Sequence, residues 1–309
     1  TPEFSVFHDK GNNETIFDRL DFQPTNTDIF HLNLFAARNW IQIPNSYDQL
    51  SQDQRQRVLT WNIAPGYQHT FNANYLLTVN PYIRKDQFTY YPSRDLEADT
   101  PSTQSQSRQL LNYGVRSDLA INKGHHNIKL GIDLKQTRLS EKFGFGITDP
   151  SFNPVCVDDS GAGVVDDLTI IDPDQCANSG FVPNPDLQPG LVAYDLTRGG
   201  QLFNYSAAHN INQYSAYVQD SITLGNFLVD VGLRGDTYYG LTADSGASPR
   251  VGLAYHVKKT GTVLRLAYSR TFETPFNENL LLSSATGVGG LAENIFGASS
   301  APPLPTGHR

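Results

Sequence analysis

Residues 226–236 read NFLVDVGLRGD, and along this stretch apolar and polar side chains alternate almost one by one. One series is apolar (Phe227, Val229, Val231, Leu233), and the series between it is mostly polar or small (Leu228, Asp230, Gly232, Arg234). Successive side chains of a β-strand point to opposite faces, so a period of two predicts a strand with one apolar and one polar face.

The same alternation occurs in three further stretches. They are residues 127–135 (NIKLGIDLK), 250–258 (RVGLAYHVK) and 263–272 (VLRLAYSRTF). Antiparallel sheets commonly have one dry and one wet face, whereas parallel sheets are covered on both sides. The chain also contains 15 Tyr and 17 Phe, which are residues that favour strands. We therefore predict an all-β protein with an antiparallel sheet.

The connections between the expected strands differ in length in a regular way. We expect about ten strands, near residues 14–23, 28–40, 55–66, 71–91, 108–122, 126–148, 206–224, 227–240, 249–258 and 262–272. Short connections (24–26, 67–70, 123–125, 225–226, 259–261) alternate with mostly longer ones (41–54, 92–107, 149–205, and the shorter 241–248). Several strands reach the roughly 9–11 residues that cross a bilayer. Short periplasmic turns opposite long extracellular loops are typical of an up-and-down transmembrane β-barrel. A soluble sheet over an ordinary core is the alternative.

In such a barrel the polar face lines the lumen and the apolar face contacts lipid. We predict nine charged residues at the lumen: Arg116, Asp118, Lys129, Asp133, Asp230, Arg234, Asp236, Arg250 and Arg265. The outward series contains five tyrosines for the lipid face or its interfacial girdle: Tyr75, Tyr113, Tyr214, Tyr255 and Tyr268.

Composition excludes other classes. The 309 residues carry a net charge of −8, which argues against a nucleic-acid partner. No apolar run approaches the roughly 18 residues of a membrane-spanning helix.

The chain lacks Met and a signal peptide, and it ends in a Pro-rich loop, so we expect both ends to be cuts in a longer protein.

Four blocks between residues 214 and 280 carry a family resemblance. They read YSAYVQD (214–220), VDVGLRGD (229–236), SPRVGLAY (248–255) and LRLAYSRTFETPFNENL (264–280). In this order and spacing the blocks resemble consecutive barrel strands of TonB-dependent outer-membrane receptors. Residues 28–46 resemble an earlier strand and loop of the same family, so the resemblance covers about two thirds of the chain.

The resemblance implies a barrel of about 22 strands with a plugged lumen. The N-terminal plug of that family contacts TonB, and this sequence contains no plug domain. We therefore expect a mid-barrel fragment, with barrel strands and loops over residues 1–272 and an outer loop at the truncated end over 273–309. The implied function is energy-coupled uptake across the bacterial outer membrane, with lipid, TonB through the absent plug, and an unknown ligand as partners. A siderophore, a cobalamin and a glycan all remain open as that ligand.

Two other functions remain open beside receptor-mediated uptake. One is a passive porin or adhesin barrel, and the other is a soluble extracellular β-protein that binds glycans. A plug encoded upstream would favour the receptor, and solubility without detergent would favour the soluble protein.

The connection at 149–205 is far longer than ordinary loops, which suggests a function of its own or disorder. It contains both cysteines, Cys156 and Cys176, and we predict a disulfide between them, as expected in an oxidising compartment, rather than two free thiols. Six of its aspartates offer oxygen ligands for calcium: Asp158, Asp159, Asp166, Asp167, Asp172 and Asp174. Their spacing does not fit an EF-hand, so we expect a solvated acidic loop and no metal.

We find no catalytic motif with the expected spacing and context in the sequence, so we predict neither an enzyme nor a cofactor. Asp159-Ser-Gly-Ala and Asp244-Ser-Gly-Ala resemble the paired motifs of pepsin-like proteases. They lie too close together in sequence, and neither follows a buried apolar strand. For ligand contact the weak candidates are Tyr238 and Tyr239, together with Arg250, although packing roles for them are the simpler hypothesis.

Overall fold

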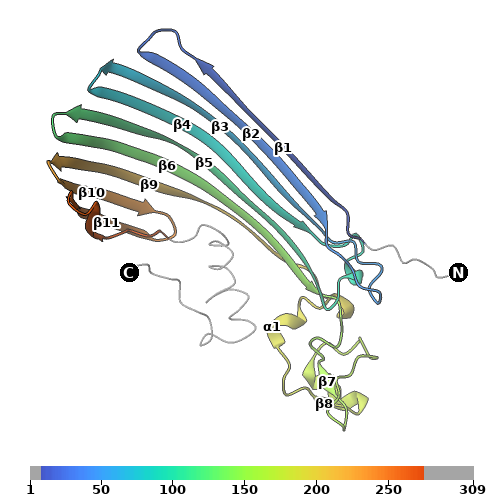
Figure 1. Cartoon of the computed structure of the whole chain (residues 1–309). Helices are drawn as coiled ribbons and strands as arrows, with labels where there is room; N and C mark the ends of the chain where they lie inside the picture. The colour runs from blue at the N-terminus through green and yellow to red at the C-terminus, as the bar shows by residue number, and fades with distance from the viewer. Residues whose placement is uncertain (1–7, 275–309) are drawn as a thin grey trace.

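The computed structural model describes residues 8–274, and ten of its strands form one antiparallel sheet (Figure 1). The strands are β1 (Gly11–Phe22), β2 (Asp28–Gln42), β3 (Arg55–Asn72), β4 (Tyr75–Tyr91), β5 (Ser102–Lys123), β6 (His126–Ile147), β9 (Phe203–Leu224), β10 (Phe227–Tyr239), β11 (Ala243–Val257) and β12 (Thr262–Ser269). Each pairs with the next along the chain, and β6 pairs with β9 across the long connection. The predicted all-β antiparallel meander is confirmed.

The sheet is open within the described residues. Strand β1 pairs there with β2 alone, and β12 pairs with β11 alone. The sheet is long and curved (Figure 1), and β5, β6 and β9 each have 22 residues, about twice the length that crosses a bilayer. This is the architecture of a segment of a large barrel wall. Among residues 8–274, no helix has the length and apolar character needed to cross a membrane.

The two faces of the sheet differ in packing as well as polarity. On one face apolar side chains such as Leu130, Ile132 and Val218 are 38–45% exposed. On the other, charged face, Leu139, Ile211 and other side chains near the outer end are fully buried. Side chains converge on the concave side of a curved sheet and spread on the convex side. The charged face is therefore the concave one, and the apolar face is convex.

Short and long connections lie at opposite ends of the sheet, as the sequence predicts. The short turns follow β1, β3, β5, β9 and β11, and Gly124 and Gly225 adopt φ near +60° in two of them. That left-handed conformation favours glycine, which fixes these two hairpins. The connections at the opposite end are residues 43–54, 92–101 and 148–202, together with one tight turn at 240–242. We call the end with the long loops the outer end.

The predicted turn at residues 67–70 is wrong, because β3 continues through it to Asn72. Tyr67 and His69 lie on the convex face, where the Tyr67 ring stacks on Phe30 at 4.7 Å and the His69 ring meets Phe71 edge-on at 4.4 Å. Asp28 accepts a hydrogen bond of 2.7 Å from the Tyr67 hydroxyl and lies 2.7 Å from His69 Nδ1. These contacts extend the strand, and the chain turns after Asn72 instead.

Two expected loops are also shorter than predicted. Strand β5 begins at Ser102, so residues 102–107 of the expected 92–107 loop are strand. Strand β11 begins at Ala243, so most of the expected 241–248 loop pairs with β10, for example Ser245 with Thr237. Both segments are rich in Ser, Gly and Gln and lack an apolar series. Their pairing comes from backbone hydrogen bonds to a neighbouring strand, which the side-chain pattern does not reveal.

The connection at 148–202 folds into a small unit at the outer end (Figure 1). It contains the two-stranded sheet of β7 (Cys156–Val157) and β8 (Val182–Pro183), the 3-10 helices η2 (Pro173–Ser179) and η3 (Leu196–Arg198), and the one-turn helix α1 (Pro189–Val192). A further 3-10 helix, η1 (Leu96–Ala98), lies in the 92–101 connection. We call residues 148–202 the outer loop unit.

The outer loop unit has its own small hydrophobic core and a disulfide. Val155, Cys156, Ile170 and Cys176 are buried together, and Cys156 is joined to Cys176 by a disulfide. Arg198 is buried beside them, and its guanidinium donates to the backbone carbonyls of residues 164, 167 and 170 at 3.0–3.2 Å. Its Nε lies 3.2 Å from Asp195, and both side chains are 1–2% exposed. One arginine thus ties three carbonyls of the loop to its C-terminal turn.

Candidate functional site on the concave face

The pairing register arranges the concave face in rows that cross the strands. One row runs from Lys129 on β6 through Gln219 on β9 and Gly232 on β10 to Arg250 on β11. Lys129 and Arg250 are far apart in sequence, yet only two strands separate them. Glycine at position 232 lets Gln219 lie close to β10, because a Cβ there would lie 3.1 Å from Gln219 Cβ, a tight contact.

The next row toward the outer end contains Asp118 on β5, Gly131 on β6, Tyr217 on β9, Arg234 on β10 and Ser248 on β11. The Tyr217 ring lies over Gly131, and its hydroxyl donates a hydrogen bond to Asp118. The Ser248 hydroxyl oxygen accepts from the backbone N–H of Phe272 at 3.1 Å. This row is the polar centre of the site.

The third row contains Arg116, Asp133, Ser215 and Asp236, and two arginine–carboxylate pairs join it to the second row. Arg116 Nε donates to Asp118 at 3.2 Å, and Arg234 Nε donates to Asp236 at 2.8 Å. Ser215 also donates to Asp236 at 2.6 Å and accepts from Arg234 Nη2 at 2.8 Å. Asp118 lies on the short-turn side of Arg116, and Asp236 lies on the outer side of Arg234, so each arginine has one carboxylate partner in the adjacent row.

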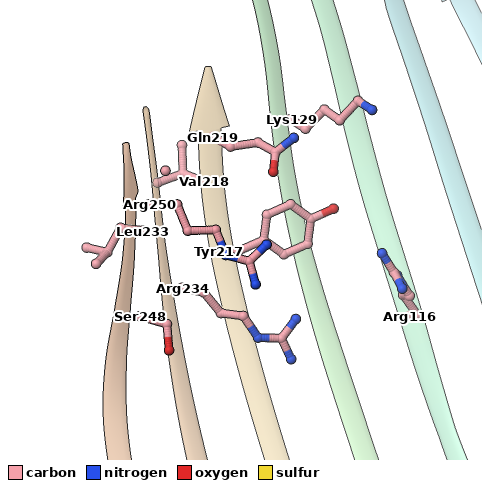
Figure 2. A pocket seen from close by; sticks show the side chains of 10 residues that line it. Arg116, Lys129, Tyr217, Val218, Gln219, Leu233, Arg234, Ser248 and Arg250 are labelled. Atoms are coloured by element: carbon pink, nitrogen blue, oxygen red, sulfur yellow. The ribbon is translucent and has the colours of Figure 1, made fainter. Parts of the chain in front are cut away.

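These rows enclose a shallow recess of about 240 Å³, shown in Figure 2. Its lining consists of Arg116, Lys129, Tyr217, Val218, Gln219, Gly232, Leu233, Arg234, Ser248 and Arg250. In Figure 2 Arg234 and Arg250 lie beside Tyr217, Arg116 lies beyond its ring on another strand, and Lys129 lies beside Gln219. Four positive side chains line the recess and no carboxylate does, so it suits a negatively charged group. Among residues 8–274, no group of three His, Cys, Asp or Glu side chains is placed to hold a metal.

A family model supplies the identity of this wall. The model of TonB dependent receptor-like β-barrels matches residues 3–304 of the chain. The chain belongs to this family. The resemblance seen in the four sequence blocks is thereby confirmed.

Solved receptors show the same fold at low sequence identity. The chain matches the ferric citrate transporter FecA in its unliganded form with a TM-score of 0.50 and 12% identity, over 81% of this chain and 34% of that one. It matches the outer membrane transporter YddB from Escherichia coli with a TM-score of 0.52 and 10% identity, over 86% of this chain and 32% of that one. It matches pyoverdine-bound FpvA from P. aeruginosa with a TM-score of 0.51 and 13% identity, over 82% of this chain and 34% of that one. No curated protein sequence matches the chain. The chain spans about a third of the length of these receptors, and members of this family are transporters rather than enzymes.

The receptor barrel places all nine sequence-predicted charges on its concave face, but only four line the recess. Those four are Arg116, Lys129, Arg234 and Arg250. Asp118, Asp133 and Asp236 lie in the two rows toward the outer end, and Asp230 lies one row toward the short turns, where it accepts from Ser221. Arg265 lies on β12 nearer the short turns, opposite Ala254.

The two tyrosines predicted as weak ligand candidates lie on opposite faces of the sheet, and the two protease-like motifs lie in different parts of the fold. Tyr238 is 1% exposed on the concave face, whereas Tyr239 is 51% exposed on the convex face. Residues 275–309, which include most of the expected terminal loop, lie outside the described residues. Asp244 lies on β11 opposite Tyr238, and Asp159 lies in an exposed turn of the outer loop unit. The receptor wall thus holds no paired-carboxylate site from these two motifs.

Three polar residues of the recess were missing from the predicted site residues. They are Tyr217, Gln219 and Ser248, all neutral. Their signal was present for β9, since the alternation through Tyr214 and Val218 on the apolar face places Tyr217 and Gln219 on the other. Selecting lumen residues by charge alone overlooks such neutral donors.

Proposed function

We propose that the chain forms part of the barrel wall of a receptor that takes up a ligand across the bacterial outer membrane, with energy supplied through TonB. One observation carries this proposal: a family barrel sheet whose convex face is mostly apolar toward the short turns and whose concave face is charged. Residues 1–272 would supply strands and loops of the wall, and residues 273–309 an outer loop. The plug and its TonB contact would lie in the rest of the receptor.

The membrane assignment is tested by a charge on each face. Val218→Arg places a cation on the convex face of β9, and Gln219→Arg places one on the concave face beside it. A lipid-facing arginine near the bilayer midplane costs about 2–4 kcal/mol, whereas a lumen arginine is solvated. In the full-length receptor we expect Val218→Arg to reduce the folded, heat-modifiable fraction in outer membranes, while Gln219→Arg retains it. Equal tolerance of both variants would contradict the assignment of the faces.

Energy coupling is tested separately, without knowledge of the ligand. The full-length receptor reconstituted in a planar bilayer should conduct no steady current, and it should cross-link to TonB in cells. A steady open-pore conductance without a TonB adduct would support the passive porin instead. Together the two measurements separate a gated receptor from an open channel.

A further inference from the structure

The recess on the concave face contains positive charge that the wall itself does not neutralise. Lys129 and Arg250 have no acidic partner within residues 8–274, and they lie at the two ends of the row that runs through Gln219 and Gly232. Arg116 and Arg234 pair with Asp118 and Asp236, but these carboxylates lie outside the recess lining. The lining of the recess therefore contains four cations and no carboxylate.

Neutral donors complete the lining. The Gln219 side-chain amide lies between Lys129 and Arg250 in the same row, and the Ser248 hydroxyl is used in the structure as an acceptor, so its proton is available. Tyr217 is fixed by its bond to Asp118 and forms one side of the recess. Charge-assisted hydrogen bonds from lysine and arginine to an oxyanion are the strong kind, and arginine suits planar or tetrahedral oxyanions in particular.

We propose that this recess binds an anionic group, a carboxylate or phosphate of the ligand that the receptor takes up. Lys129 and Arg250 would supply the charge, and Gln219 and Ser248 would donate neutral hydrogen bonds. The recess of about 240 Å³ accommodates one such group rather than a whole large ligand, so it serves as a wall subsite. The inference deepens the proposed function by naming a ligand class, and it rests on the concave face lining the lumen.

The test uses inorganic phosphate as the probe and the full-length receptor in detergent. We expect calorimetry at low ionic strength to show saturable phosphate binding that sulfate displaces and choline does not. The double variant Lys129→Gln/Arg250→Gln should weaken it at least about tenfold, since two charge-assisted contacts are lost. Neither side chain has a bond to the described chain, so the variant should fold, which heat-modifiability verifies.

Matched controls come from the same face. Lys135→Gln lies on β6 three rows outward from Lys129, and Arg265→Gln lies on β12, and neither residue lines the recess. These variants remove the same charge and should keep the phosphate affinity within about twofold. An equal loss in controls and recess variant would show only a long-range charge effect and would overturn the site.

Two other outcomes would also overturn the proposal. One is phosphate affinity unchanged in the double variant. The other is an absence of binding in the intact receptor with binding restored after removal of its plug, which would show that the wall cations pair with carboxylates of the plug. Because binding in detergent needs no TonB, phosphate binding can persist even where energy coupling fails. The two proposals therefore fail in distinguishable ways.

Discussion

The hydroxyl of Tyr217 on β9 donates a hydrogen bond to Asp118 on β5, across the intervening strand β6. The bridge is possible because β6 has glycine at the crossing point. A Cβ on Gly131 would lie 2.3 Å from Tyr217 Cε1 and 2.6 Å from Asp118 Oδ1, well inside contact distance. Three neighbouring strands of the sheet are thereby fixed to one another by side chains in addition to their backbone ladders.

Gly131→Ala should break this bridge. The added methyl group displaces the Tyr217 ring, and overpacking of this kind costs about 1–3 kcal/mol. We expect a lower temperature for loss of the heat-modifiable form of the full-length receptor. Gly252→Ala on β11 is the matched control, because its nearest neighbour on the same face is at 3.4 Å, an ordinary contact. Indistinguishable melting of the two variants would show that the bridge contributes nothing.

The disulfide should stabilise the outer loop unit locally rather than the sheet. Closing a loop of this size contributes about 3 kcal/mol in the chain-entropy model, and the disulfide joins two segments of one small core. For Cys156→Ser/Cys176→Ser we expect rapid protease cleavage within residues 148–202 on intact cells, with the heat-modifiability of the barrel unchanged. Wild type treated with a reductant should give the same cleavage map. A shift of barrel melting without new cleavage would contradict a local role.

Arg198 should matter to the outer loop unit as much as the disulfide does. Removing one partner of a buried ion pair costs about 3–5 kcal/mol, and Arg198→Met would leave Asp195 without its ion-pair partner and three carbonyls without their donor. We expect faster amide hydrogen exchange throughout residues 154–200 and unchanged exchange in β5 and β6. Arg94→Met, at a side chain 83% exposed in its own ion pair with Asp53, serves as the control and should change exchange little.

Side-chain periodicity predicted the strands well where one face carries an apolar series and the other face a polar series. Strand β10 and its neighbours alternate at nearly every position, so their existence and the placement of the charged series on one face of the sheet follow from the sequence. Periodicity failed at 67–70 because Tyr67 and His69 form an aromatic row with Phe30 and Phe71, whereas their polar atoms suggest a turn. It also failed at 243–248, where small polar residues pair through the backbone alone.

The recess and the core of the outer loop unit depend on information that one sequence does not carry. The juxtaposition of Lys129 with Arg250 follows from the register of three successive strand pairs, and a slip of one residue in any pair would remove it. The packing of Ile170 against Cys176 and the placement of Arg198 depend on how a long connection closes on itself. Both are products of tertiary structure, and alternation within a strand determines neither.

Acid should open the outer loop unit before it affects the barrel. Bonds from the Ser160 hydroxyl at 2.6 Å and from the Ala162 N–H at 2.9 Å lower the pKa of Asp158, and the Thr169 hydroxyl at 2.6 Å lowers the pKa of Asp167. Carboxylates with a lowered pKa stabilise the fold above the ordinary value of about 3.9, and this contribution is lost as the pH falls below it. Residues 148–202 contain nine aspartates and one arginine, so their net charge of −8 equals that of the whole chain.

The measurement is protease cleavage or hydrogen exchange of the outer loop unit between pH 7 and pH 3. We expect protection to be constant down to about pH 4.5 and to fall below pH 4. In the open loop these carboxyl groups have their ordinary pKa, whereas in the folded loop their pKa is lowered. Between the two values the open loop therefore binds more protons, and acid favours opening. Asp158→Asn/Asp167→Asn retains acceptor oxygens but cannot titrate, so its protection should vary less with pH. A wild-type profile that is flat to pH 3, or one that the asparagine variant reproduces in full, would show that these two carboxylates do not control the stability of the unit.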